Sequence, residues 1–340
     1  MKKILLILLL IPVNAFALTV PSRNAILIDQ DSGRVLYSKR INEKRLIAST
    51  TKIMTAIIAI ESNKLDDKVK VNDSVLKAYG SGIYIKPGEI LTLRDLVYGL
   101  LLRSGNDAAL MIEDYLGGHD KFIKLMNNKA SEIGMKDTIF MNSNGLDDSN
   151  EENYSTVYDM ALLMKYANNN YDFREINSTK TYTLSTNLND YVWKNENKLL
   201  YRYKYATGGK TGFTDKARRT LVSSACQRQK DTCLIAVTFN DSDDFNTHIK
   251  LYEYGFNNYK RYLIINKNKF KVKNKDDLYI KYNYYYLLKE EEKKDMGTIL
   301  IKDRKDDIYG YIIVKFKGKE VHREPVYINK KYKKKKLFDY

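Results

Sequence analysis

A lysine at the start of an apolar segment is the feature that most limits how this chain can fold. Lys52 is followed by residues 53–60, which are almost wholly apolar, and residues 49–61 contain no Gly or Pro. Their length and composition predict a buried helix rather than a strand. Because burial disfavours the charged form of lysine, an amine pressed against this helix loses some of its preference for the proton.

Ser49 precedes Lys52 by three residues, so the two side chains share one face of the predicted helix and can meet. A neutral Lys52 could then take the proton of the Ser49 hydroxyl, with the helix N-terminus favouring the developing anion. The plainer alternative is that Ser49 caps the helix and Lys52 is solvated in the first turn. That alternative does not explain why core residues follow Lys52 at once.

Two further short motifs follow in order. Ser104-Gly105-Asn106 lies in a polar turn between two predicted helices, where both polar side chains can point the same way across the glycine. Lys210-Thr211-Gly212 follows two more glycines and predicts an edge strand without bulk, along which a peptide can lie as an added strand. The amine of Lys210 and the hydroxyl of Thr211 offer a seat for a carboxylate.

Ser-x-x-Lys, Ser-x-Asn and Lys-Thr-Gly in this order resemble the motif set of penicillin-binding proteins and serine β-lactamases. The surrounding residues are similar to those of the low-molecular-mass D-alanyl-D-alanine carboxypeptidases, and the resemblance covers about residues 25–256. Gly105 matches these carboxypeptidases, whereas the most similar β-lactamases have Asp there and a separate acidic loop, for which we find no clear counterpart. The stretches that carry the resemblance are residues 47–55, 102–109, 134–138, 144–146, 154–156, 159–160 and 210–214.

The resemblance implies a role for each catalytic residue. Ser49 would be the acylated nucleophile and Lys52 its general base. Ser104 would pass a proton to the leaving amine, and Asn106 would hold Lys52 and the substrate amide.

The resemblance also implies the substrate-binding residues. Lys210 would support Ser104 electrostatically, and Thr211 would bind the terminal carboxylate of the substrate. The backbone N–H groups of Ser49 and of Phe213, just past Gly212, would form the oxyanion hole.

Two positions depart from the family pattern. Asn144 stands where some members have His, and residues 241–246 contain none of the arginines that many members have there. Arg218 or Arg219 is therefore a candidate helper in binding the carboxylate.

The order of elements predicts an α+β sandwich with an all-helical insertion, followed by a small all-β domain. The resemblance implies that the larger part has the β-lactamase/transpeptidase-like fold. We expect a catalytic domain at 18–262 and a β-rich domain at 266–329. The predicted helices are 49–61, 93–102, 108–116, 155–167 and one around 247–254; the predicted strands are 25–28, 34–37, 179–184, 203–205, 220–225, 234–239, 270–272, 278–286, 298–301, 309–316 and 326–328.

Residues 1–17 have the form of a secretory signal peptide, with two lysines, an apolar run at 4–11 and Ala15-Phe16-Ala17 as a cleavage site. The apolar run is too short for a spanning anchor. We therefore expect export through the cytoplasmic membrane, to the periplasm or the cell surface. Cys226 and Cys233 flank a predicted hairpin loop, and the sequence leaves open a disulfide or two free thiols.

The net charge of +16 is concentrated near the C-terminus, where residues 266–340 hold 22 basic and 12 acidic residues. The tail, 330–340, is too short and polar for the amphipathic anchoring helix that is common in the family. The composition of the tail indicates either a solvated segment or a segment that contacts an anionic membrane peripherally. The lysines concerned are Lys330, Lys331, Lys333, Lys334, Lys335 and Lys336. Nucleic acid is not an expected partner of a secreted chain.

The expected function is that of a serine DD-carboxypeptidase that removes the terminal D-Ala from peptidoglycan stem peptides. Water would resolve the acyl-enzyme, and β-lactams would acylate Ser49. The alternatives are a DD-endopeptidase on cross-links, a β-lactamase and a non-catalytic wall-binding protein. We expect no cofactor and no metal, since His119, His248 and His322 are isolated and residues 241–244 lack the pattern of a calcium loop.

Overall fold

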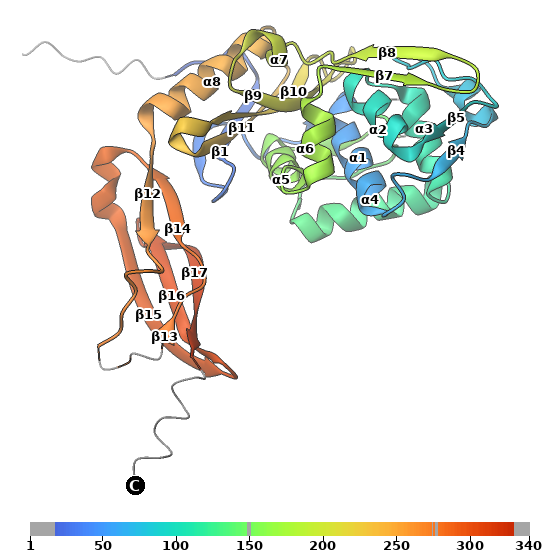
Figure 1. Cartoon of the computed structure of the whole chain (residues 1–340). Helices are drawn as coiled ribbons and strands as arrows, with labels where there is room; N and C mark the ends of the chain where they lie inside the picture. The colour runs from blue at the N-terminus through green and yellow to red at the C-terminus, as the bar shows by residue number, and fades with distance from the viewer. Residues whose placement is uncertain (1–17, 148–150, 274, 276–277, 330–340) are drawn as a thin grey trace, which may run out of the picture.

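The computed structural model of the protein describes residues 18–147, 151–273, 275 and 278–329. The predicted signal peptide and the lysine-rich tail lie outside the described residues. Figure 1 shows a larger part that combines a sheet with helices, and an elongated β-rich part that stands away from it. No helix among the described residues is long and apolar enough to cross a membrane.

The larger part is built on an antiparallel five-stranded sheet in the order β2-β1-β11-β10-β9. Alternate residues of β1, β10 and β11 enter two different cores, as the period of two in a strand requires. Ile26 and Val222 face the helical block, while Leu27 and Leu221 face the C-terminal helix of this part. The strands are β1 (Asn24–Asp29), β2 (Val35–Lys39), β9 (Ala206–Gly212), β10 (Thr220–Gln227) and β11 (Thr232–Phe239), and the covering helix is α8 (Asp244–Asn258).

The helical block packs against the opposite face of this sheet and contains the predicted buried helix. Its elements are η1 (Ala48–Thr51), α1 (Lys52–Glu61), α2 (Leu93–Leu102), α3 (Asn106–Tyr115), α4 (His119–Ile133), α5 (Val157–Ala167) and α6 (Tyr171–Ser178). Thr92, Thr156 and Asn170 cap α2, α5 and α6 through their side-chain oxygens. Helices α4 and α6 were not predicted from the sequence.

Short elements connect the sheet and the helices. They are η2 (Asp73–Lys77), α7 (Leu199–Arg202), η3 (Arg228–Lys230) and the strand pairs β3 (Arg45–Leu46) with β6 (Tyr154–Ser155), β4 (Lys68–Lys70) with β5 (Ile90–Thr92) and β7 (Thr181–Ser185) with β8 (Asp190–Lys194). The prediction of a strand at 203–205 was wrong, because these residues form the turn that follows α7, and β9 begins only at Ala206. The prediction that Lys210 lies on an edge strand is confirmed.

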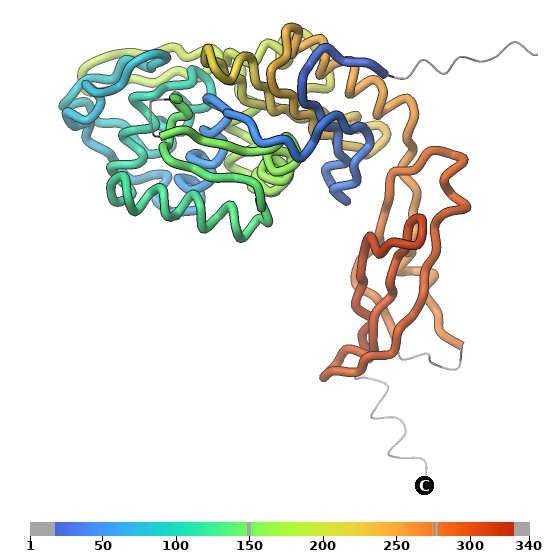
Figure 2. The backbone as a smooth tube through the Cα atoms, turned by 180° about the vertical axis from the view of Figure 1, so that it is seen from behind, coloured from blue at the N-terminus to red at the C-terminus, as the bar shows by residue number. Residues whose placement is uncertain are grey.

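The C-terminal part packs two sheets around a small core of its own. In the first sheet, β12 (Lys260–Ile265) pairs with β14 (Tyr284–Leu288). The second sheet has four strands in the order β13 (Leu278–Tyr279), β17 (Lys319–Ile328), β16 (Ile308–Phe316) and β15 (Met296–Lys305). The 3-10 turn η4 (Glu290–Asp295) links the two sheets. The strand predicted at 278–286 is two strands, and the one predicted at 270–272 contributes only a bridge between Val272 and Lys275. Figure 2 shows the same separation of the two parts from behind.

Candidate active site

Ser49 and Lys52 meet at the start of α1, as their spacing predicts. Ser49 lies in the 3-10 turn η1 and is half-buried, and no side chain caps the helix that follows. The Lys52 amine is fully buried, 3.0 Å from the Ser49 hydroxyl, 2.7 Å from Oδ1 of Asn106 and 2.5 Å from the backbone carbonyl oxygen of Asn144. Ser49 is therefore no capping residue and Lys52 is not solvated, which excludes the plainer alternative.

These three contacts suit a neutral lysine. Burial lowers the pKa of Lys52 well below its usual value, and the positive charge of Lys210 lowers it further, while Asp107 and Glu196 oppose the shift. A neutral amine has two hydrogens, which can be donated to Asn106 and Asn144, and one lone pair, which can accept the hydrogen of Ser49. The geometry thus equips Lys52 to take the proton of the nearby hydroxyl.

The Ser104-Gly105-Asn106 motif joins α2 to α3, with Asn106 as the first residue of α3. Ser104 has a left-handed backbone (φ 59°), a conformation that costs energy for a residue with a side chain and recurs at functional sites. Asn106 donates from Nδ2 to the carbonyl oxygen of Tyr79 at 2.6 Å while its Oδ1 accepts from Lys52. The amide of Asn106 is therefore held from both ends.

Asp107 fixes the loop that passes over this motif. Its buried carboxylate accepts hydrogen bonds from the backbone N–H groups of Ile83 and Tyr84, the latter at 2.6 Å. The loop in turn places Ser81 beside Ser104 at the rim of the site. The role of Asp107 was not predicted from the sequence.

Strand β9 brings the third motif to the same place. Lys210 is buried, and its Nζ donates to the carbonyl oxygen of Thr211 at 2.8 Å. Burial lowers the pKa of Lys210 to about 8, while the negative charge of Glu196 opposes the shift. Gly212 passes so close to η1 that a Cβ there would lie 2.9 Å from the backbone nitrogen of Ser49.

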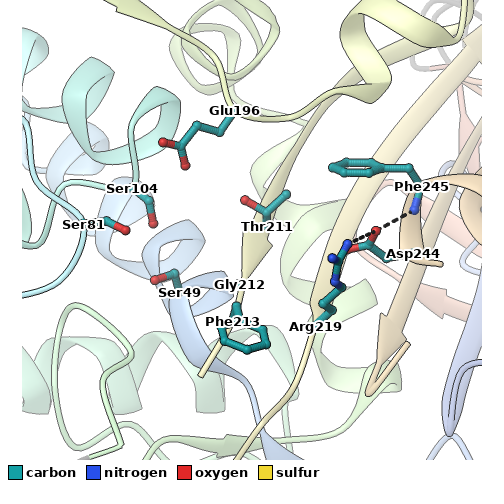
Figure 3. A pocket seen from close by; sticks show the side chains of 10 residues that line it. All are labelled: Ser49, Ser81, Ser104, Glu196, Thr211, Gly212, Phe213, Arg219, Asp244 and Phe245. Atoms are coloured by element: carbon teal, nitrogen blue, oxygen red, sulfur yellow. Dashed lines mark hydrogen bonds and ion pairs between the residues drawn. The ribbon is translucent and has the colours of Figure 1, made fainter. Parts of the chain in front are cut away.

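Figure 3 shows the cleft that these elements enclose, with a volume of about 450 Å³. Its lining residues are Ser49, Ser81, Ser104, Glu196, Thr211, Gly212, Phe213, Arg219, Asp244 and Phe245. Arg219, one of the two arginines suggested by the sequence, lines the cleft 3.8 Å from Asp244, whereas Arg218 is not among the lining residues. On the other side of Thr211, Glu196 lies 3.3 Å from Nη1 of Arg103.

Glu196, Asp244 and Phe245 were not predicted as site residues. Nothing in the sequence marks Glu196, because its place in the cleft depends on two buried neighbours, Asn195 and Asn197, whose side chains hold the backbone of that segment. Asp244 and Phe245 belong to residues 241–246, where the sequence pattern was considered for an arginine and, at 241–244, for a calcium loop.

The remaining candidates lie outside the cleft. His248 is fully buried between Ser223 and Thr238, where burial lowers its pKa to about 3. His119 contacts Glu113, and His322 stacks on a tyrosine ring. Among the described residues, no three His, Cys, Asp or Glu side chains gather as a metal ion would require. Cys226 and Cys233 form a disulfide.

Residues 12–243 match the D-alanyl-D-alanine carboxypeptidase family, peptidase S11. The chain is 34% identical over 257 residues to the D-alanyl-D-alanine carboxypeptidase DacF of Bacillus subtilis, a match that covers 73% of this chain and 65% of DacF. The chain thus spans slightly less than two thirds of that relative.

Solved structures of similar proteins support the fold of both parts. Penicillin-binding protein 6B of Escherichia coli superposes with a TM-score of 0.73 at 27% identity, over 93% of this chain and 98% of that chain. A D-alanyl-D-alanine carboxypeptidase of Mycobacterium tuberculosis gives a TM-score of 0.67 at 31% identity, over 70% of this chain and 92% of that chain. The predicted α+β fold with a following β-rich part is therefore confirmed.

Proposed function

The chain belongs to the D-alanyl-D-alanine carboxypeptidase family, and on that premise we propose that it is a serine DD-carboxypeptidase which removes the terminal D-Ala from peptidoglycan stem peptides. The observation that carries this proposal is the fully buried Lys52 amine, 3.0 Å from the Ser49 hydroxyl. A serine at its ordinary pKa is a weak nucleophile, and an adjacent neutral amine is the base that it needs.

In the first step, Ser49 attacks the carbonyl carbon of the penultimate D-Ala as Lys52 takes its proton. The carbonyl oxygen becomes an oxyanion, which the backbone N–H groups of Ser49 and Phe213 stabilise. The C–N bond then breaks, Ser104 gives its proton to the leaving amine, and the proton that Lys52 took from Ser49 replaces the one that Ser104 has lost. In the second step water attacks the acyl-enzyme, releases the shortened peptide and restores the Ser49 hydroxyl. β-Lactams form the same bond to Ser49.

The terminal carboxylate of the substrate binds at Thr211. The hydroxyl of Thr211 donates a hydrogen bond, and Lys210 and Arg219 supply positive charge on the same side of the cleft. Arg219 takes the place of the arginine that many family members have in the segment corresponding to 241–246. The observation that supports this role of Arg219 is its position in the lining of the cleft, where its half-exposed side chain lies beside Asp244.

The enzyme acts outside the cytoplasmic membrane, as the signal-peptide pattern at 1–17 indicates. The six lysines at 330–336 attach it peripherally to anionic lipid, each contributing about 1 kcal/mol before screening. In a sedimentation experiment with anionic vesicles, the protein should bind at low salt and leave at high salt. Deletion of 330–340 should abolish this binding, and binding that survives either treatment would contradict the attachment.

The test of the catalytic proposal is hydrolysis of a D-Ala-D-Ala-terminated pentapeptide, followed by mass spectrometry of the products. Wild-type protein should release one D-Ala, and penicillin should add its mass to a tryptic peptide containing Ser49. Ser49→Ala should abolish both reactions and leave the fold intact. Labelling of Ser49→Ala at the wild-type rate would overturn the assignment of the nucleophile.

A further inference from the structure

The carboxylate of Glu196 has no role in the proposed function, although it lines the catalytic cleft. The lining contains two acidic side chains, Glu196 and Asp244. Asp244 lies beside Arg219, which also lines the cleft, so its charge faces a cation there. Glu196 lies on the other side of Thr211, and its partner Arg103 is not among the lining residues. A negative charge therefore stands in the cleft, although the cleft is proposed to bind an anionic substrate.

Glu196 is fixed in this place by its neighbours. Its backbone N–H donates to the carbonyl oxygen of Leu102 at 3.0 Å, which ties it to the end of α2. The buried side chains of Asn195 and Asn197 hold the backbone on either side of it. Arg103 lies 3.3 Å from Oε1 of Glu196 and anchors the carboxylate itself. A half-exposed ion pair adds little stability, so the Arg103 pair alone does not explain why this segment is held so firmly.

The carboxylate points to the place where the leaving residue must lie. Figure 3 shows Glu196, Ser104 and Thr211 on three sides of one gap in the cleft. In the proposed function, Ser104 gives its proton to the nitrogen of the terminal D-Ala, and the carboxylate of that residue binds at Thr211. The terminal residue therefore spans the gap from Ser104 to Thr211 and passes beside Glu196.

The charge of Glu196 acts across this part of the cleft. Burial lowers the pKa of Lys52 and of Lys210, and the negative charge of Glu196 opposes both shifts. Water is largely excluded when a substrate fills such a cleft, and interactions between charges strengthen as it leaves. A charge that reaches both buried amines also reaches a substrate nitrogen that lies between Ser104 and Thr211.

The leaving nitrogen becomes positively charged during the reaction. In the tetrahedral intermediate it is bonded to the former carbonyl carbon, to Cα of the terminal residue and to one hydrogen. The proton from Ser104 adds a fourth bond as the C–N bond breaks, so positive charge builds up on the nitrogen. The electron pair of the broken bond stays on the nitrogen, and D-Ala leaves as a neutral amine. The oxygen of an ester is far less basic and leaves as an alcohol without becoming a cation.

We propose that Glu196 makes the enzyme selective for amide over ester substrates, because its carboxylate stabilises the positive charge on the leaving nitrogen. This inference rests on the proposed function and adds a specificity-determining residue to it. A fixed charge aimed at the place where the opposite charge develops lowers the energy of the transition state. It helps only a substrate that develops this charge, and such differential binding determines specificity. Arg103 offsets part of the repulsion between Glu196 and the substrate carboxylate.

The test compares two substrates that differ only in the leaving atom, a pentapeptide ending in D-Ala-D-Ala and a depsipeptide ending in D-Ala-D-lactate. Release of D-Ala and of D-lactate is followed by mass spectrometry. Glu196→Gln keeps the size of the side chain and removes its charge. It should lower kcat/KM for the pentapeptide by roughly tenfold and leave that for the depsipeptide within about twofold of wild type. The ratio of the two values therefore falls.

Arg103→Gln is the matched control, because it breaks the same ion pair and keeps the carboxylate of Glu196. It should leave the ratio at or above the wild-type value. An unchanged ratio in Glu196→Gln, with or without a loss on both substrates, would overturn the inference and leave the proposed function standing. A fall of the ratio in Arg103→Gln as large as that in Glu196→Gln would also overturn it. If wild type does not cleave the pentapeptide, the proposed function itself fails.

Discussion

Gly212 of β9 lies against the backbone of Ser49 so closely that a Cβ on residue 212 would stand 2.9 Å from the Ser49 nitrogen and 2.5 Å from Oγ1 of Thr220. The absence of a side chain therefore lets the edge strand approach the nucleophile. The proposed oxyanion hole needs this approach, because its two N–H donors come from η1 and from the residue just after Gly212.

Gly212→Ala should impair acylation by pushing the strand away from Ser49. Loss of one oxyanion donor lowers the rate by about 100-fold or more, and we expect a loss of that size in kcat/KM for the pentapeptide. The control is Gly297→Ala in β15, where a Cβ would meet nothing within 4 Å. Near-normal penicillin labelling of Gly212→Ala would show that the close approach does not matter for catalysis.

The pH dependence should report two lysines with opposite requirements. Lys52 must be neutral to act as a base, so kcat/KM should rise with pH as Lys52 loses its proton. Because the pKa of Lys52 is lowered, this rise should occur at a pH well below the usual pKa of lysine. Lys210 must be charged to bind a carboxylate, and with a pKa of about 8 it loses that charge above this pH. The profile should therefore rise and then fall above about pH 8. Lys210→Arg should move the falling limb to higher pH, and an unchanged limb would assign it to another group.

Arg219 and its neighbour Arg218 allow a matched test of the site that binds the substrate carboxylate, since only Arg219 of the two lines the cleft. Arg219→Ala should raise KM for peptides with a free terminal carboxylate and have little effect on amidated ones, because the lost interaction is between opposite charges. Arg218→Ala should change neither. Equal effects of Arg219→Ala on both kinds of peptide would mean that Arg219 only supports the fold through Asp244.

The parts predicted well from the sequence are those in which local spacing decides the structure. The meeting of Ser49 and Lys52 follows from two residues three apart at the start of a helix, and the continuous apolar run after Lys52 can only be buried. Helix α4 was missed because only Phe122, Met126 and Ala130 are buried along its length. Such a narrow stripe gives little periodic signal among polar neighbours.

Contacts between distant segments could not be predicted in the same way. The carbonyl oxygen of Asn144 reaches the Lys52 amine across 92 residues of sequence. Glu196 enters the cleft because Asn195 and Asn197 hold its segment and its backbone N–H donates to the carbonyl oxygen of Leu102 at the end of α2. A backbone acceptor has no sequence signature, since every residue provides one. The sequence therefore indicated the chemical groups of the site but not what surrounds them.

The Cys226–Cys233 disulfide joins directly opposite residues of β10 and β11. The loop that it closes is short, so the entropic gain is limited, and reduction should lower the free energy of unfolding by about 2 kcal/mol. A Cys226→Ser/Cys233→Ser variant should therefore melt a few degrees lower and keep its activity at 25 °C. An activity loss that persists below the melting range would show that the bridge also shapes the cleft.

One of the contacts between the two parts of the chain centres on Arg34, whose side chain is almost closed to solvent. Arg34, just before β2, contacts both carboxylate oxygens of Glu292 at 2.7 and 2.8 Å and donates to the carbonyl oxygen of Leu287. Its guanidinium also lies over the rings of Tyr259, Tyr286 and Phe316, the last at 4.5 Å. The side chains of Arg34 and Glu292 are 8% and 14% exposed.

Arg34→Ala should loosen the C-terminal part and leave pentapeptide hydrolysis unchanged, since Arg34 lies outside the cleft. Removing one partner of a buried ion pair costs about 3–5 kcal/mol, because the other charge stays buried and unpaired. Small-angle scattering should show a broader distribution of shapes, and calorimetry should resolve two unfolding transitions. The variant with both Arg34→Met and Glu292→Gln should recover part of the loss, since neither charge then remains buried.

The Arg34–Glu292 contact should also weaken in acid. Burial raises the pKa of Glu292, but the hydrogen bonds from Arg34 and from the backbone N–H of Lys289, together with the charges of Arg34 and Lys317, outweigh it, and the pKa lies below its usual value of 4.5. The pair therefore contributes its full stability above about pH 4.5, and that contribution is lost as the pH falls through the lowered pKa of Glu292. The stability difference between wild type and Arg34→Ala should shrink over that acid range. A difference that stays constant with pH would show that the aromatic contacts of Arg34, rather than its ion pair, account for its stabilising effect.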